Sequence, residues 1–289
     1  MLSYKRRYSK KKLHNEQNNH SIPKKGFIMK YCTLILMLCM PLYGAIKTPV
    51  YVYAHGLANT AAQAFNYKGV LFDGPVVTFD FPDATRNFWR VNIINSALGQ
   101  KKEVDHLAAI LKHRIQQNPQ AVYVGIGVSR GTATWLNVMG IYQFNQVKAL
   151  VLESPLDSIA STVSPIQHAL LPFIFMHYSE KGMQPRDHIA DIPKDLPILI
   201  ICVKDDHRVP YTSSVEVYRL LQESGHKNTH ILIFESGNHG KFVLGDHRAM
   251  YKNVAHAFYK KYGLSYNKKA AQLGQKIFKQ TQPNPEDLL

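Results

Sequence analysis

The chain has 289 residues, of which 45% are hydrophobic and 19% charged, so it can bury one substantial core and a single large α/β domain is expected. Its formal net charge of +15 suggests a nucleic-acid ligand until the charge is divided along the chain. Residues 1–30 carry +8 and residues 260–289 carry +4, which leaves +3 for the body between them. A basic face interleaved with aromatic side chains is absent from the sequence, and nucleic-acid binding is therefore not expected.

The N-terminal region resembles a secretory signal in its organisation. Lys30 precedes a short uncharged apolar run, YCTLILMLCMPLYGA, from Tyr31 to Ala45, which ends in small residues. The run contains a proline and is short for a bilayer span. We expect residues 1–45 to be a basic extension and a cleaved signal peptide, so that the protein is secreted or periplasmic; the alternative is a membrane anchor that is not cleaved. Met29 would itself be an ordinary start, in place of Met1.

After Ala45 the chain alternates between apolar runs of strand length and amphipathic segments of helix length. This alternation predicts an α/β fold with a mostly parallel central sheet and helices on both faces. The main domain is expected over residues 46–263. Strands are expected at 48–55, 75–81, 121–128, 147–154, 197–203 and 229–236, and helices at 99–117, 132–144, 212–225 and 242–263.

Two segments depart from this alternation. Residues 155–196 interrupt it and include the apolar stretch IQHALLPFIFMHY at 166–178, which predicts a small helical cap insertion with a lid helix. Residues 264–289 are predicted to be a polar, basic C-terminal tail with one short helix.

A serine stands between two glycines where the strand at 121–128 gives way to a helix. The stretch GVSRG, from Gly127 to Gly131, matches the G-x-S-x-G pattern of a tight strand-to-helix turn. Side chains two positions before and after the serine would collide with the neighbouring strand and helix, and glycine removes those collisions. Such a turn exposes the serine hydroxyl and aims a helix N-terminus at it. Ser129 is therefore the predicted nucleophile.

A serine hydroxyl needs a base that an acid holds in place, and both types follow later strands in the order Ser, Asp, His. With these partners the sequence resembles the α/β-hydrolase-fold serine hydrolases, the superfamily of esterases, lipases and prolyl oligopeptidases, over about Val50 to Tyr262. The matching stretches are YVYAHGL, GIGVSRGT, LIICVKDDHRVP and ESGNHG.

The resemblance implies specific roles. Asp206, which has the spacing of a D-x-x-V-P turn, would be the acid, and His239 would be the base. The oxyanion hole would use the backbone N–H groups of Leu57 and Arg130, with Ser129 as the nucleophile.

Several assignments stay open at this point. Asp205 or Asp157 could serve as the acid instead, and His55 is expected to shape the oxyanion turn rather than to transfer protons. Glu153 is expected to form hydrogen bonds at its strand end. The guanidinium of Arg130 would either bind an anionic group of the substrate or pair with a nearby acid.

The predicted function is hydrolysis of a carboxylic ester through an acyl-enzyme on Ser129. The alternatives are a stand-alone serine peptidase of the prolyl-oligopeptidase type and a catalytically silent hydrolase fold used for binding. No metal-ligand cluster or phosphate-binding glycine loop is found in the sequence, so no cofactor is expected. The expected partner is an acyl-ester substrate, and the basic tails would allow association with an acidic membrane surface. The sequence does not indicate an oligomeric state.

Overall fold

The computed structural model describes residues 48–57, 59–82, 100–158, 161 and 182–288, within one compact unit that extends from Ala45 to Leu289. The expected signal peptide and the expected lid helix at 166–178 lie outside these residues. Within the described ranges, no helix combines the length and the apolar character that a membrane span requires.

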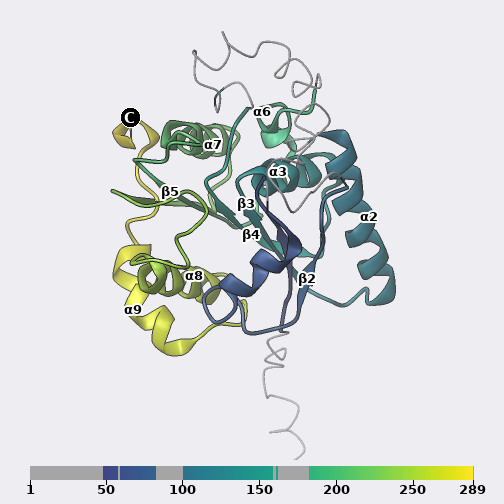
Figure 1. The fold of residues 1–289 in the computed structure, drawn as a ribbon, viewed down its shortest axis with the longest axis horizontal. Coiled ribbons are helices and arrows are strands. Elements are labelled where there is room, and N and C mark those ends of the chain that lie inside the picture. Colours follow the sequence, from purple (N-terminus) through teal and green to yellow (C-terminus); the bar gives the residue numbers. More distant parts are fainter. Residues whose placement is uncertain (1–47, 58, 83–99, 159–160, 162–181, 289) are drawn as a thin grey trace, which may run out of the picture. The chain divides into compact units, whose positions relative to one another are not determined.

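The centre of the fold is a parallel six-stranded sheet with the order β2-β1-β3-β4-β5-β6 (Figure 1). A parallel sheet is covered on both faces, which explains why its central strands are almost unbroken apolar runs. The strands are β1 (Val50–Ala54), β2 (Val76–Thr78), β3 (Tyr123–Val128), β4 (Val147–Glu153), β5 (Ile198–Val203) and β6 (Thr229–Phe234).

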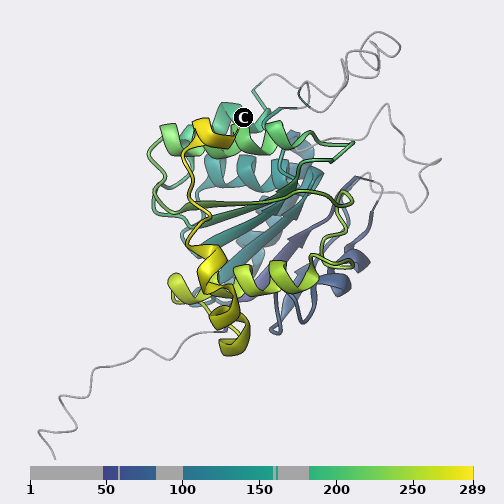
Figure 2. The same cartoon turned by 90° about the vertical axis from the view of Figure 1, so that its left-hand side faces the viewer.

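Helices form a layer on each face of this sheet (Figure 2). Alternate strand residues point to opposite faces, so that Tyr51 and Tyr53 of β1 join the cluster with α8 and α9, whereas Val52 and Ala54 join the cluster with α2, α3 and α7. The α-helices are α2 (Lys101–Gln117), α3 (Arg130–Tyr142), α6 (Pro185–His188), α7 (Tyr211–Glu223), α8 (Arg248–Lys261) and α9 (Lys268–Phe278). The 3-10 helices are η1 (Ala61–Tyr67), η4 (Ile189–Asp191) and η5 (Pro285–Leu288).

This architecture is the predicted α/β fold, and each predicted strand is present. The largest difference in a helix boundary is at α8, which begins at Arg248 rather than at residue 242. Phe242 and Val243 are instead buried in the loop before the helix, where they join the core without extending it.

The C-terminal segment packs closely on the domain rather than forming a free tail. Ala270, Ala271 and Phe278 of α9 are buried against the α8 layer. The chain then passes the edge of the sheet, where the amide of Ile231 donates to the carbonyl of Thr281 at 2.7 Å. It ends beside α7 (Figure 1). This crossing covers part of the edge strand β6, which would otherwise expose unpaired backbone groups.

Of the expected cap at 155–196, the structure describes residues 155–158, 161 and 182–196. Residues 182–196 include α6 and η4, and both pack against α3. The side chain of Asn137 in α3 donates to the carbonyl of Met183 at 2.8 Å, and Met183 and Ile189 are buried. This part of the segment therefore belongs to the body of the domain.

The contact between α8 and α9 generates a stability prediction. A Cβ atom on Gly274 would lie 2.1 Å from the carbonyl oxygen of Asn253, so Gly274→Ala must push the helices apart. We expect a loss of about 1–3 kcal/mol in the free energy of unfolding, even though alanine favours a helix. Leu273→Ala, on the exposed side of α9, is the matched control and should change stability by less than about 0.5 kcal/mol. Urea unfolding measures both, and equal midpoints for the two variants would contradict this packing.

Candidate active site

Ser129 occupies a strained turn between β3 and α3. Its φ of 51° and ψ of −115° lie outside the usual regions for a residue with a side chain. The glycines around it are required by close packing, since a Cβ on Gly131 would lie 2.1 Å from the carbonyl oxygen of Ala54, and one on Gly127 would lie 2.8 Å from the carbonyl oxygen of Gly131. The collisions inferred from the sequence therefore have identified partners.

Hydrogen bonds hold this turn from both sides. The amide of Ser129 donates to the carbonyl of Glu153 at the end of β4 (2.8 Å). The carbonyl of Ser129 accepts the amide of Thr132 at 2.9 Å and the hydroxyl of Thr132 at 2.6 Å. These contacts fix the main chain on either side of the serine hydroxyl.

His239 and Asp206 form a hydrogen-bonded pair. Nδ1 of His239 lies 2.7 Å from Oδ2 of Asp206, and because a carboxylate only accepts, Nδ1 carries the proton and Nε2 is left as the basic atom. Oδ1 of Asp206 accepts the amides of Arg208 (2.8 Å) and Val209 (3.0 Å), which explains the D-x-x-V-P spacing. The hydroxyl of Ser154 donates to Oδ2 at 3.1 Å.

These contacts control the charge of Asp206, whose side chain is 1% exposed. Burial on its own would raise the pKa of this carboxyl. The hydrogen bond and charge of His239, together with the amides of Val209 and Arg208, outweigh burial and hold the pKa below its ordinary value. Asp206 is therefore an anion at neutral pH.

The loop that carries His239 lies beside the turn that carries Ser129. A Cβ on Gly240 would lie 3.5 Å from Cγ1 of Val128, the residue immediately before the serine. The amide of Gly237 donates to Oδ1 of Asp205 at 2.8 Å, so Asp205 braces this loop and Asp206 faces the imidazole. Among the described residues no hydrogen bond joins the Ser129 hydroxyl to His239, and such bonds often tighten only when substrate binds.

The two amides expected to form the oxyanion hole come from adjacent strand ends. Arg130 is the first residue of α3, and Leu57 follows the end of β1. A Cβ on Gly56 would lie 3.6 Å from Cβ of Ser129, so the turn after β1 approaches the serine closely. This places the main chain of both residues next to the serine, although their role stays a prediction.

His55 is part of the buried support for that turn. Its Nδ1 donates to the carbonyl of Gly56 (2.8 Å), and its Nε2 accepts the amide of Phe81 (3.4 Å). Burial lowers the pKa of His55 to about 4, and the imidazole is neutral. One ring nitrogen therefore holds the turn after β1, and the other connects that turn to the segment after β2.

The side chain of Arg130 points into the protein. The guanidinium is 2% exposed, lies 3.3 Å from a carboxylate oxygen of Glu103 in α2, and stacks over the ring of Phe81 with its carbon 4.2 Å from the ring centroid. The sequence left two roles open for this guanidinium, binding an anionic group of the substrate or pairing with a nearby acid. In the structure it pairs with an acid, Glu103. The buried pair connects α2 to the start of α3.

The alternative acid Asp157 is engaged elsewhere. It forms an ion pair with Arg186 of α6, and its Oδ1 accepts the hydroxyl of Ser213 at 2.6 Å. Asp157 thus anchors α6 to α7, and Asp206 is the acid that reaches His239.

Two supporting residues received no role in the sequence analysis. Ser154 has a φ of 50° and donates to Asp206, and its position directly after a buried strand is the signal that would have indicated a functional side chain. Glu103 is buried in α2. It stands four residues before Leu107 and therefore on the apolar face of the helix, where a carboxylate indicates a buried ion pair. Both residues act on the site through a neighbour.

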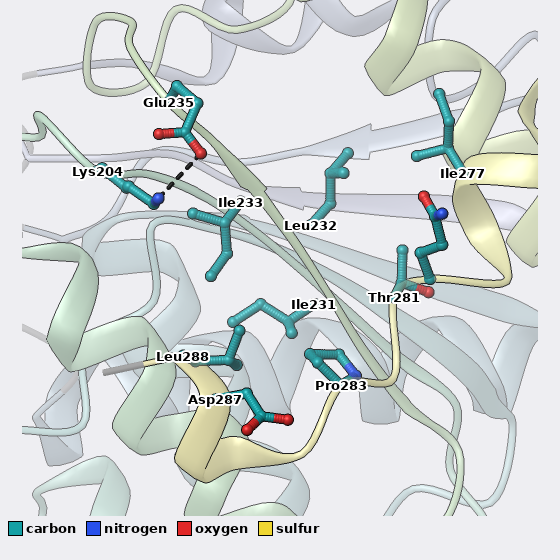
Figure 3. A pocket seen from close by; sticks show the side chains of 11 residues that line it. Lys204, Ile231, Leu232, Ile233, Glu235, Ile277, Thr281, Pro283, Asp287 and Leu288 are labelled. Carbon is teal, nitrogen blue, oxygen red and sulfur yellow. Dashed lines mark ion pairs between the residues drawn. The ribbon is translucent and has the colours of Figure 1, made fainter.

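A separate groove lies along the edge strand β6 (Figure 3). Lys204 and Glu235 form an ion pair of 2.9 Å at one end of it, and C-terminal residues from Ile277 to Leu288 line the other side. None of the predicted site residues lines this groove. Within the part of the chain that the structure describes, no group of three or more His, Cys, Asp or Glu residues is arranged to hold a metal ion.

Comparison with solved structures supports the fold. An acylaminoacyl peptidase of Pyrococcus horikoshii matches with a TM-score of 0.60 and 18% identity, over 78% of this chain but 38% of its own. The Pyrococcus furiosus esterase Pf2001 matches with a TM-score of 0.55 and 15% identity, over 75% of this chain and 82% of its own. Est1E of Butyrivibrio proteoclasticus, solved with ferulic acid, matches with a TM-score of 0.55 and 16% identity, over 77% of this chain and 92% of its own.

Sequence comparison gives the family. The uncharacterized protein YfhR of Escherichia coli K12 is 25% identical over 174 residues, which cover 60% of this chain and 57% of YfhR. The chain thus spans little more than half the length of this curated relative. The model of the prolyl oligopeptidase family matches residues 101–263, more than half of the chain, and this range includes Ser129, Asp206 and His239. The chain belongs to the prolyl oligopeptidase family, within the serine hydrolases of the α/β-hydrolase fold.

Proposed function

We propose that this serine hydrolase cleaves carboxylic esters through an acyl-enzyme, with Ser129 as nucleophile, His239 as general base and acid, and Asp206 as the residue that orients the imidazole. The observation that carries the proposal is the 2.7 Å contact between His239 and a buried Asp206, on a loop packed beside the strained turn of Ser129.

In the proposed mechanism, Oγ of Ser129 attacks the carbonyl carbon of the ester while its proton passes to Nε2 of His239. Negative charge collects on the carbonyl oxygen, where the amides of Leu57 and Arg130 would stabilise it. The imidazolium then gives its proton to the departing alkoxide, which leaves as an alcohol. Water repeats the sequence on the acyl-enzyme and releases the acid.

Asp206 makes this cycle more favourable because it faces the positive charge that forms on His239. Its bond to Nδ1 also keeps the basic lone pair on Nε2. The two amides and the Ser154 hydroxyl satisfy the remaining acceptor positions of the carboxylate, so the side chain has one defined orientation.

A match over most of the length of an esterase supports ester substrates. The match covers 82% of the Pyrococcus furiosus esterase Pf2001 but only 38% of the acylaminoacyl peptidase. The family match is the observation that favours the second candidate, a stand-alone peptidase. Esters also make the smaller demand on the site, because an alkoxide leaves more readily than an amine.

The first test concerns the nucleophile. Wild-type protein should react covalently with a fluorophosphonate probe, and Ser129→Ala should lose this labelling and at least about 1,000-fold in kcat on a short p-nitrophenyl ester. Thr132→Ser, which keeps the hydroxyl that supports the turn, is the control and should still react. Well-folded wild-type protein that does not label would instead favour the catalytically silent binding role.

The second test separates the two neighbouring aspartates. Asp206→Asn keeps an acceptor for the two amides but places a donor against His239 or forces the imidazole into the other tautomer, so kcat should fall by roughly 1,000-fold or more. Asp205→Asn keeps the acceptor for the amide of Gly237 and should change kcat by less than about threefold. Equal losses in the two variants, measured on the same ester, would refute the assignment of the acid.

The third test addresses the bond that is cleaved. We expect kcat/KM for short p-nitrophenyl acyl esters to exceed that for the matched p-nitroanilides and for chromogenic dipeptide amides by more than about 100-fold, because the amine is the poorer leaving group and the site is proposed to serve esters. Comparable values for an amide and its matched ester would favour the peptidase. Ser129→Ala run in parallel shows which part of each rate depends on the site.

A further inference from the structure

A second buried carboxyl lies beneath the site, and the proposed mechanism does not use it. Glu153 is the last residue of β4 and is 0% exposed. Its side chain points to the sheet face that carries η1 and α8, where the hydroxyl of Tyr67 donates to its Oε2 at 3.0 Å. The hydroxyl of Tyr251 and the amide of Phe242 also face this carboxyl.

The groups that act on the Glu153 carboxyl among the described residues are hydroxyls, an amide and another carboxylate. Tyr53 of β1, Tyr67 of η1, Tyr251 of α8, the amide of Phe242 and the carboxylate of Asp206 are the groups that influence it. In the described chain, no lysine, arginine or histidine lies within 4.0 Å of its carboxylate oxygens. Burial raises the pKa of Glu153 to about 8, and the negative charge of Asp206 acts in the same direction.

Glu153 lies against the segments that carry the parts of the proposed active site. Its carbonyl accepts the amide of Ser129 at 2.8 Å. The next residue, Ser154, donates to Asp206 at 3.1 Å. Phe242 lies three residues after His239 in the chain. Tyr67 is the last residue of η1, which follows the turn at His55. If this position served packing alone, an acidic side chain would not be needed. Leucine would fill the volume without the free-energy cost of burying a carboxyl.

We propose that Glu153 is a positioning residue for the hydrolysis, holding the turn of Ser129, the loop of His239 and the segment after β1 in register from beneath the site. This inference rests on the proposed function. The carboxyl performs this task in its neutral form. Ionisation would place a second anion beside Asp206 without a cation to balance it, and the contacts beneath His239 would have to rearrange.

The test compares Glu153→Gln, Glu153→Ala and wild-type protein between pH 6 and 10. Glutamine keeps the volume and an acceptor for Tyr67 but does not ionise, so kcat at pH 7 should stay within about threefold of wild type. Wild-type kcat should fall above about pH 8, and Glu153→Gln should lack this fall. Glu153→Ala removes the acceptor and should lose at least about tenfold in kcat while KM changes by less than about threefold.

The exposed Glu235, which also follows a strand, provides a matched control. Glu235→Gln removes one carboxylate without touching the site, and its pH profile should superimpose on that of wild type. Identical profiles for Glu153→Gln and wild type would overturn the proposal, and so would a Glu153→Ala variant with wild-type kcat. If the alanine variant does not fold, the glutamine profile decides alone.

Fluorophosphonate labelling distinguishes this failure from failure of the proposed function. A wild-type protein that labels, with the same rate and pH dependence as Glu153→Gln, refutes only the role of Glu153. A folded wild-type protein that does not label refutes the hydrolase proposal and the positioning role with it.

Thermal unfolding reports the charge state of Glu153 independently of activity. The folded protein keeps the proton up to about pH 8, whereas the unfolded chain releases it near the ordinary value of 4.5. The unfolded state therefore binds fewer protons between these values, and the contribution of Glu153 to stability falls as pH rises through that range. We expect the Tm of Glu153→Gln minus that of wild type to increase between pH 5 and 8 and then to level off. A constant difference would show that the carboxyl is not held neutral.

Discussion

The site depends on one steric constraint, the close approach of the turn after β3 to the end of β1. The carbonyl of Ala54 leaves no room for a side chain at Gly131, and the carbonyl of Gly131 leaves none at Gly127. This packing stabilises the unusual backbone of Ser129, which would otherwise relax to an ordinary turn. The hydroxyl is thereby held at the edge of the sheet where the loops after the other parallel strands also end.

Four acids are buried in the part of the chain that the structure describes, and their partners determine how each is stabilised. Glu103 has the guanidinium of Arg130, and Asp157 has that of Arg186. Asp206 has an imidazole, two amides and a hydroxyl as partners, and its negative charge would stabilise a proton that arrives on His239. Glu153 has a tyrosine hydroxyl and no cation within ion-pair distance in the described chain, and burial raises its pKa to about 8. Burial is common to all four, so their partners determine their charge.

The sequence predicted those features that local patterns determine. Unbroken apolar runs gave the parallel strands, glycines two positions either side of Ser129 gave the strained turn, and the spacing from Asp206 to Val209 and Pro210 gave an acid whose carboxylate accepts nearby amides. Contacts between distant segments were not accessible in this way. Arg130 is 27 residues from Glu103 in the chain, and only the packing of α2 on α3 brings them together. The packing of α9 was also not predicted. Its buried face is rich in alanine and glycine rather than in large apolar residues, so the sequence pattern does not mark it as a core helix.

At Arg130 the backbone and the side chain face different parts of the protein. In the proposed mechanism, position 130 supplies its amide to the oxyanion, and the start of α3 fixes the direction of that amide whatever the side chain is. The side chain points the other way, into the space between α2 and the ring of Phe81, where a buried carboxylate makes a cation acceptable. The charge of Arg130 therefore does not indicate that the substrate carries an anionic group. The residues proposed to set the chemistry are those whose polar atoms face the strand ends, and among the acids that the structure describes Asp206 is the one whose carboxylate accepts from the imidazole of His239.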